Sequence, residues 1–327
     1  MAATRGTRKS QLQYVPPAMP DRLELQHPRL VPRPPSGPGW IHEIKFDGYR
    51  LQLRIERGRV RIWTRNGHDW TDRFPELAED AAELPDAILD GELCALDPKG
   101  RPDFSALRAA ITPGRTAPLV LFAFDVLWAG GEDLRPYALA ARKGVLTDLL
   151  AHAPSARLRL VDHFEVGGST LLESACRMGL EGVVSKRLEA PYRSGRGETW
   201  LKSKCRPGQE VVIGGWKQAP QGPFRGLLAG VYDRAGRLVY AGSVKGGFAG
   251  AGGLLARLQA LETAERPFRA GDPPRKTSDI HWVRPELVAA VDIAEWTGGG
   301  KLRQASFKGL REDKDPREVV REAAEET

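Results

Sequence analysis

The stretch HEIKFDGYRLQLRIERGRVRI, residues 42–62, decides the fold of the N-terminal half of this chain. Residues 51–62 alternate strictly between apolar and polar side chains on either side of a turn at Arg57-Gly58. This alternation predicts a half-buried antiparallel hairpin. We expect its outer face to be solvated and to attract nucleic acid only weakly through four arginines: Arg54, Arg57, Arg59 and Arg61.

Lys45 is the fourth residue of the same stretch, two residues before Asp47 of the Asp47-Gly48 pair. Burying a lone charged amine at the end of a strand costs free energy, so such a residue is expected to have a function. The pattern Lys-x-Asp-Gly is short, however, and it describes a solvated strand end beside an ordinary hairpin turn equally well. The charged clusters farther along the chain must decide between these two interpretations.

Composition limits the classes of protein to consider. A length of 327 residues predicts two domains, and the net charge of +7 suits a polyanionic partner, although solubility alone would also explain it. The three cysteines, Cys94, Cys176 and Cys205, are odd in number and lack C-x-x-C spacing. We therefore expect neither a disulfide framework nor a zinc ribbon, and a reducing cytoplasm. Without an apolar signal or a run of ~20 apolar residues, we expect neither secretion nor membrane insertion.

The chain divides into a leader and two domains. Residues 1–20 are polar and basic, and we expect a mobile leader, with the first strand beginning at Trp40. Residues 21–205 predict an α+β domain with mainly antiparallel pairing. Its expected helices lie near 74–84, 138–152 and 168–178, and its further strands at 88–96, 119–128, 182–186 and 199–205.

After residue 205 the sequence becomes rich in short strands with glycine-containing turns. Strands are expected at 211–216, 227–232, 238–244 and 288–296, with one helix near 254–262. Several short strands interrupted by a single helix predict a small closed barrel, such as an OB-fold, in residues 206–327.

Two glutamates are candidate ligands for a divalent cation. Strand alternation places Glu92 on one face with Asp90 and Cys94, and Glu181 begins the strand at 182–186. Mg²⁺ takes only one or two protein carboxylates, with water and phosphate supplying the rest. Glu92 and Glu181 could be those two, although an exposed acidic strand face is the alternative.

Lys202 and Lys204 share one face of a strand and repel each other unless an anion binds them. A bound phosphate would be favoured there, and the same two cations would lower the pKa of Lys45 and so favour its neutral, nucleophilic form. A basic surface strand is an equally good description of this segment. Phe122, Phe124 and Trp128 share a face of the strand 119–128, and we expect Phe122 and Trp128 to be core residues.

Seven segments follow one another in a characteristic order: KFDGYR (45–50), TRNG (64–67), DGEL (90–93), FAFD (122–125), EGVVSK (181–186), WLKSK (200–204) and FKGLREDK (307–314). In this order they match the motifs of the covalent nucleotidyltransferase superfamily. The chain resembles bacterial ATP-dependent DNA ligases, and specifically the ligase module of bacterial non-homologous end joining. The resemblance covers residue 20 to the end and implies a nucleotidyltransferase (adenylation) domain followed by an OB-fold domain.

The resemblance also implies roles for individual residues. Lys45 would be the nucleophile that is adenylylated by ATP. The implied nucleotide and metal contacts are Glu43 with adenine, Phe124 stacked on its ring, Arg50 and Arg65 with the nucleotide or the DNA 5′-phosphate, Glu92 with ribose or metal, Glu181 with metal, and Arg196, Lys202 and Lys204 with the nucleotide phosphate. The implied residues that orient the pyrophosphate are Arg311, Asp313 and Lys314.

The implied reaction seals a 5′-phosphate to a 3′-hydroxyl through a lysyl-AMP and a DNA-adenylate, with ATP and Mg²⁺, or Mn²⁺ in its place, as cofactors. The two domains would reorient about a hinge at 205–210. Implied partners are nicked or broken double-stranded DNA and a Ku-like end-binding protein, for a monomer associated with the nucleoid in the bacterial cytoplasm. The alternatives are an RNA ligase, a capping-type guanylyltransferase and a non-catalytic OB-type DNA-binding adaptor.

Overall fold

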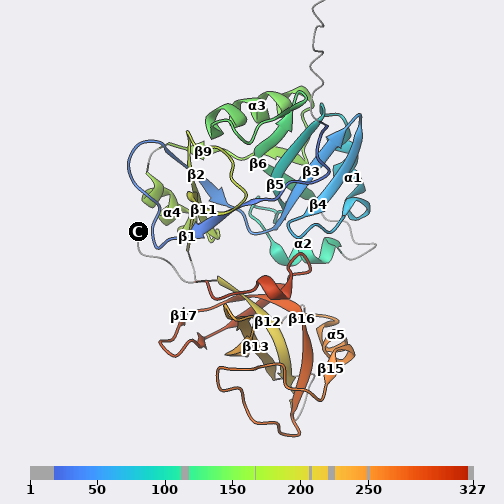
Figure 1. Ribbon diagram of the computed structural model, residues 1–327, viewed down its shortest axis with the longest axis vertical. Coiled ribbons are helices and arrows are strands. Elements are labelled where there is room, and N and C mark those ends of the chain that lie inside the picture. The colour runs from blue at the N-terminus through green and yellow to red at the C-terminus, as the bar shows by residue number, and fades with distance from the viewer. Residues whose placement is uncertain are drawn as a thin grey trace, which may run out of the picture.

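The computed structural model describes residues 18–111, 118–165, 167–205, 208–219, 225–248 and 251–322. Figure 1 shows a mixed helical and stranded part that contains the N-terminal half of the chain, and below it a part built mainly of strands. The expected leader lies outside the described residues except for residues 18–20, and so do residues 206 and 207 of the expected hinge.

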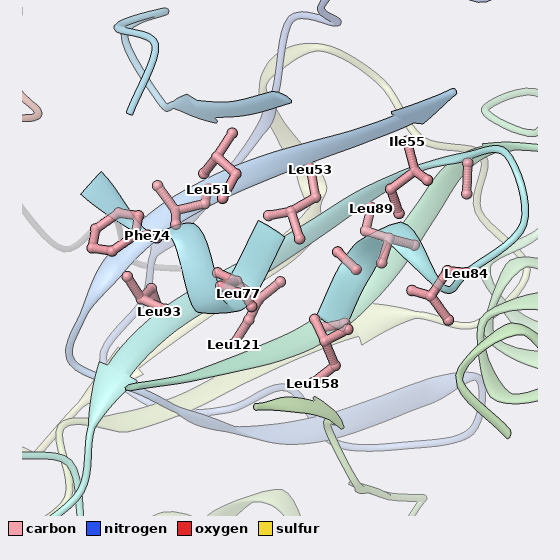
Figure 2. Packing of buried hydrophobic residues seen from close by; sticks show 14 of the residues in the cluster. Leu51, Leu53, Ile55, Phe74, Leu77, Leu84, Leu89, Leu93, Leu121 and Leu158 are labelled. Carbon is pink, nitrogen blue, oxygen red and sulfur yellow. The ribbon is translucent and has the colours of Figure 1, made fainter. Parts of the chain in front are cut away.

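The larger N-terminal sheet grows out of the predicted hairpin, and its strand order is β4-β3-β5-β6-β7 with β8 beside β6. Its strands are β3 (Tyr49–Glu56), β4 (Arg59–Thr64), β5 (Ala87–Ala95), β6 (Leu119–Ala129), β7 (Glu132–Asp133) and β8 (Leu158–Leu160). The first hydrophobic core lies on this sheet, where Leu51, Leu53 and Ile55 of β3 point toward Leu77 and Leu84 (Figure 2). The alternation in residues 51–62 therefore produced the predicted hairpin.

Helices cover this part of the chain at or near the expected positions. They are the 3₁₀ turn Thr71–Arg73, α1 (Pro75–Ala82), α2 (Phe104–Ile111), α3 (Leu139–His152) and α4 (Gly168–Arg177). Helices α1 and α3 contact β6, whereas α4 contacts β10 of the second sheet. Helix α2 was not predicted, and it contacts β19 of the C-terminal part.

The second N-terminal sheet contains Lys45 and most of the segments EGVVSK and WLKSK, and its strand order is β1-β11-β10-β2-β9. Its strands are β1 (Gln26–Leu30), β2 (Trp40–Lys45), β9 (His163–Phe164), β10 (Gly182–Arg187) and β11 (Gly195–Lys204). Strand β10 pairs antiparallel with both neighbours, so that Gly182 is opposite Lys45 on one side and Lys204 on the other. This register brings together three motifs that are far apart in the sequence.

The C-terminal part is the expected all-β barrel. Its main sheet has the order β14-β13-β12-β16-β15 with β19 beside β16, and residue Gly246, just after β14, bridges Ser306 of β19. The elements are β12 (Gly208–Lys217), β13 (Gly226–Tyr232), β14 (Leu238–Val244), α5 (Leu254–Ala260), β15 (Glu262–Thr263), β16 (Ile280–Asp292), β17 (Glu295–Trp296), β18 (Leu302–Arg303), β19 (Ser306–Leu310) and the 3₁₀ turn Pro316–Glu318. The fold is thus α+β followed by an OB-type barrel.

Three expectations about the fold were wrong. The first strand is β1 and not the strand at Trp40, because β1 is added parallel to β11 from a distant part of the chain. Strand β16 begins at Ile280 rather than residue 288, since it continues past Pro285 where its pairing with β12 shifts register. Arg54 is not solvated: its guanidinium donates to the carbonyl of Pro20 at 2.9 Å, because the entering chain covers that face of the hairpin.

Candidate functional site

A cavity of about 530 Å³ opens where the second sheet faces the barrel, and its size is in the ordinary range for a small-molecule site. The candidate residues that line it are Glu43, Lys45, Arg50, Arg65, Glu92, Phe124, Glu181, Arg196, Lys202, Lys204, Arg311 and Lys314. Asp313 does not line the cavity, and it is fully buried behind Arg311. The structure therefore gathers all but one of the predicted site residues around a single space.

Lys45 is paired with Glu181 at the centre of this cavity. The Nζ atom of Lys45, at the end of β2, donates to Oε2 of Glu181 at 2.6 Å. Glu181 immediately precedes Gly182, where a Cβ atom would lie 2.1 Å from the carbonyl oxygen of Ser203. Only glycine fits beside β11 at this point, so the glycine of the EGVVSK segment permits the close pairing of β10 with β11 next to Glu181.

The protonation state of Lys45 is the opposite of the one expected. Burial alone would lower the pKa of Lys45, but the carboxylates of Glu181 and Glu92 outweigh burial and raise it. The expected net lowering of the pKa of Lys45 is therefore wrong: Lys45 and Lys202 do repel each other, but the nearby carboxylates outweigh that repulsion. The carboxylate of Glu181 is in direct contact with the amine, and Coulomb interactions weaken with distance. In this arrangement Lys45 is a stable ammonium.

Glu92 lies beside this pair on β5. Burial raises the pKa of Glu92 to about 7, although Lys45, Arg311 and Arg50 act to lower it. Among the described residues, no group of three or more His, Cys, Asp and Glu side chains has the arrangement of a metal site. Two glutamates facing one cavity are nevertheless a fitting set of hard oxygen ligands for Mg²⁺, which takes one or two carboxylates and completes its shell with water and phosphate.

Lys202 and Lys204 point to the same side of β11, as their spacing predicted, and both contact a carboxylate. Glu322 accepts from Lys202 at 2.7 Å and from Lys204 at 3.0 Å. Burial lowers the pKa of Lys202 to about 8, and Lys204 also acts to lower it, whereas Glu322 acts to raise it. Glu322 was not predicted to be in the site, because an acidic residue in a charged C-terminal segment gives no signal in the sequence.

The same sheet also carries a buried charge cluster around Glu43, which lies on β2 two residues before Lys45. Glu43 is 2% exposed and lies 2.7 Å from Lys143 and 2.6 Å from Lys186. The Nζ atom of Lys186 also lies 4.3 Å from the ring centres of both Phe124 and Trp200. Lys143 and Lys186 were missed as site residues. Lys186 belongs to the EGVVSK segment, whereas nothing in the sequence around Lys143 connects it with Glu43.

Arg50 is held in place by two strands. Its guanidinium donates to both carboxylate oxygens of Asp90, at 2.9 and 2.6 Å, and to the carbonyl of Gln26 at 2.7 Å. Asp90 is fully buried and does not line the cavity, so it orients Arg50. Arg65 and the exposed Arg196 line the cavity as expected.

The barrel closes the cavity with its last charged segment. Arg311 is held by both carboxylate oxygens of Asp313 at 2.8 Å, and its guanidinium carbon lies 5.2 Å from the ring centre of Tyr49. Lys308 of β19 contacts Asp47 at 2.5 Å and so joins the barrel to the turn that follows Lys45. Lys314 is 3.0 Å from Glu210. The terminal segment therefore faces the predicted nucleophile in this structure.

Cys176 and Cys205 form a disulfide, which contradicts the expectation of no disulfide. The two residues are 29 positions apart, and spacing gave no sign of the pairing. They meet because α4 packs on β10, which places the end of the helix beside the end of β11. Both cysteines line the cavity, and the amide of Cys205 donates to the carbonyl of Glu181 at 2.9 Å. Cys94 is the one free cysteine among the described residues, and it is buried.

Two family models match the chain in the same order as its two parts. The ATP dependent DNA ligase domain matches residues 33–204, and the ATP dependent DNA ligase C terminal region matches residues 220–314.

Individual relatives agree with these matches. The multifunctional non-homologous end joining protein LigD of Pseudomonas aeruginosa is 44% identical over 313 residues, which are 93% of this chain. The LigD protein of Mycobacterium tuberculosis H37Rv is 38% identical over 291 residues, or 86% of this chain. The chain spans 37% of the length of each of these two relatives.

A solved structure of mycobacterial DNA ligase D complexed with ATP and MES is also similar to this chain. It is 37% identical and superposes with a TM-score of 0.63, covering 90% of this chain and 98% of that one. In the part of the chain that the structure describes, no helix has the length and apolar character needed to cross a membrane.

Proposed function

This chain belongs to the ATP-dependent DNA ligase family, and from that premise we propose that it seals 5′-phosphate and 3′-hydroxyl ends of DNA through a lysyl-AMP intermediate. One observation carries the proposal: Lys45, two glutamates and the lysine pair Lys202 and Lys204 line one cavity of about 530 Å³. The end-joining names of the LigD relatives and the ATP in the name of the similar solved structure support the same reading.

In the first step, the lone pair of Lys45 Nζ attacks the α-phosphorus of ATP. The bond from that phosphorus to the oxygen bridging to the β-phosphate breaks, and pyrophosphate leaves. The amine must first lose a proton, and Oε2 of Glu181 already accepts a hydrogen bond from it. Glu181 is therefore positioned to receive the proton, and Arg311 and Lys314 reach the cavity from the barrel to orient the leaving pyrophosphate.

The remaining steps transfer AMP to a DNA 5′-phosphate and then displace it with the 3′-hydroxyl. Phosphoryl-type transfer depends chiefly on positioning and on positive charge around the phosphates. Lys202, Lys204 and Arg196 supply that charge, and Glu92 and Glu181 would hold a Mg²⁺ ion that neutralises phosphate charge.

The barrel must leave the cavity for DNA to enter, because Lys308 and Arg311 now cover it. We place the domain boundary between residues 205 and 206 and the hinge at 205–210. The proposed setting is repair of nicked or broken double-stranded DNA in the bacterial cytoplasm by a monomer, with a Ku-like end-binding partner.

The proposal is tested by incubating the protein with ATP labelled at the α-phosphate in the presence of Mg²⁺. We expect an acid-labile covalent adduct in the parent protein and none in Lys45→Ala. Lys99→Ala, which changes an exposed lysine in a turn, is the matched control and should retain the adduct. Absence of the adduct in the parent protein would refute the proposal and leave a non-catalytic DNA-binding adaptor.

Two further arms separate the related enzymes. Labelled GTP in place of ATP would label a capping-type guanylyltransferase, and we expect no label from it here. Sealing of a nicked DNA duplex should exceed sealing of a nicked RNA duplex, whereas the reverse order would identify an RNA ligase.

A further inference from the structure

The C-terminal segment of the described chain, residues 319–322, contributes Val319, Val320 and Glu322 to the lining of the cavity. The carbonyl of Val319 accepts from the amide of Tyr232 at 2.7 Å. The side chain of Gln209 donates to the carbonyl of Val320 at 3.0 Å and accepts from the amide of Glu322 at 3.0 Å. The segment is thus fixed to the barrel on both sides of Val320, and this places Glu322 over β11.

The carboxylate of Glu322 binds the two lysines as an anion. One oxygen accepts from Lys202 at 2.7 Å and the other from Lys204 at 3.0 Å, and the side chain of Glu322 is only 20% exposed. Burial alone would raise the pKa of Glu322, but these two lysines outweigh it and hold the pKa far below its ordinary value. A carboxylate that offers one oxygen to each lysine has the same charge and contact pattern as two oxygens of a phosphate group.

We propose that Glu322 is a built-in competitor for the phosphates of ATP, which must be displaced from Lys202 and Lys204 before the nucleotide binds productively. The inference rests on the proposed function, because it takes the two lysines to be phosphate ligands. It extends that function by adding a regulatory contact: the tail of the barrel keeps the phosphate subsite filled when no nucleotide is present.

The charges explain both why the contact forms and why it yields. Two lysines side by side repel each other, and the single negative charge of Glu322 relieves that repulsion in the resting protein. The triphosphate of ATP carries more negative charge and attracts the same pair more strongly. A site that is free for only part of the time has an apparent affinity reduced by that fraction. The competitor therefore raises the ATP concentration that the enzyme needs.

The decisive variant is Glu322→Gln, which keeps the size of the side chain and removes its charge. We expect the KM for ATP in lysyl-AMP formation to fall about tenfold. This is the change expected if Glu322 occupies the site about nine-tenths of the time in the parent protein. The kcat for the same step should stay within about twofold of the parent, because a competitor that ATP displaces acts on binding and not on the later step. Glu322→Asp retains the charge and should give an intermediate KM.

One control and one further test variant make the result specific. Glu295→Gln removes another ion-paired glutamate of the barrel, 2.6 Å from Arg303 and not among the residues that line the cavity, and should leave the KM unchanged. Gln209→Ala releases the backbone of the tail without altering the charge of Glu322, and it should lower the KM in the same direction as Glu322→Gln.

Binding of a non-hydrolysable ATP analogue, measured by calorimetry, gives a readout that does not depend on catalysis. Tighter binding by Glu322→Gln than by the parent is expected. An unchanged or weaker affinity, or an unchanged or higher KM, would overturn the inference while leaving the adduct on Lys45, and with it the proposed function, intact. Failure of the parent protein to form the adduct would instead count against the proposed function.

Discussion

The Nζ atom of Lys45 and the Oε2 atom of Glu181 lie 2.6 Å apart across the pairing of β2 with β10. Gly182, the residue after Glu181, stands opposite both Lys45 and Lys204, and a Cβ atom there would clash with the carbonyl oxygen of Ser203. The consequence of the pair is electrostatic. The residue proposed as the nucleophile rests as an ammonium, so it must first give up a proton, which Glu181 is positioned to receive.

Removal of one carboxylate should make Lys45 easier to deprotonate. Although burial acts to lower the pKa of Lys45, Glu181 and Glu92 raise it above its ordinary value of 10.5. Glu181→Gln should therefore lower this pKa, because it removes the adjacent opposite charge that raises it most. The pH dependence of Lys45 acetylation by acetic anhydride, followed by mass spectrometry, measures the shift.

Glu295→Gln is the control for this titration, since Glu295 pairs with Arg303 and neither residue lines the cavity. The acetylation midpoint of the control should match that of the parent protein. A midpoint in Glu181→Gln that stays the same or moves to higher pH would contradict the assignment of Glu181 as the main stabilising charge.

Phe124 and Phe122 are two positions apart on β6 and should respond differently to truncation. Phe124 lines the cavity, whereas Phe122 stacks on Phe46 with ring centres 4.0 Å apart and belongs to the core. Stacking of a base on an aromatic side chain contributes about 1–3 kcal/mol, so Phe124→Ala should raise the KM for ATP by roughly tenfold or more. Phe122→Ala should instead lower the free energy of unfolding by about 3–5 kcal/mol.

Adenylylation kinetics and urea unfolding, applied to both variants, separate these two effects. If Phe122→Ala raised the KM as much as Phe124→Ala at a temperature where both are folded, the assignment of Phe124 alone to the nucleotide would be wrong.

Arg311 should matter for the reaction with ATP and not for the final sealing step. It reaches the cavity from the barrel, where the pyrophosphate would leave, and the barrel must move away before DNA binds. We expect Arg311→Ala to slow lysyl-AMP formation by about 10²-fold, as for loss of one positioned charge at a reacting phosphate. Sealing of a nick that already carries AMP should change little.

Asp313 would remain buried without its partner in Arg311→Ala, so thermal unfolding must accompany the kinetics. Arg257→Ala is the matched control, because Arg257 pairs with Glu312 at an exposed position beside the same segment. An equal loss in the adenylylation and sealing steps would show that Arg311 acts on the fold rather than on the leaving group.

The disulfide between Cys176 and Cys205 predicts a definite thiol count. Protein denatured without a reducing agent should expose one reactive thiol, Cys94, whereas reduced and denatured protein should expose all three cysteines. Titration with a thiol reagent measures both values. Cys94→Ser should abolish the single thiol of the unreduced protein, and three thiols in unreduced parent protein would contradict the pairing.

Periodicity was the most reliable guide to the fold. The alternation in residues 51–62 predicted a hairpin, and the short strands with glycine-containing turns after residue 205 predicted a barrel. Both patterns are formed by residues close together in the sequence, so they can be recognised without the tertiary structure. Strand β1 and the cover over Arg54 could not be predicted in this way. Each depends on which distant segment is added to a sheet edge, and local propensity does not contain that information.

The sequence by itself determined the chemical inventory of this protein: the lysine before Asp47-Gly48, two glutamates, two lysines with strand spacing, and the order of seven short motifs. The tertiary structure alone decided how those charges pair. It put Glu181 against Lys45, Glu322 against Lys202 and Lys204, and Cys176 against Cys205. The physical reason is that a pKa or an ion pair depends on separations of a few ångströms. Those separations are set by the register of β10 and by the docking of the barrel, and they cannot be deduced from residue spacing.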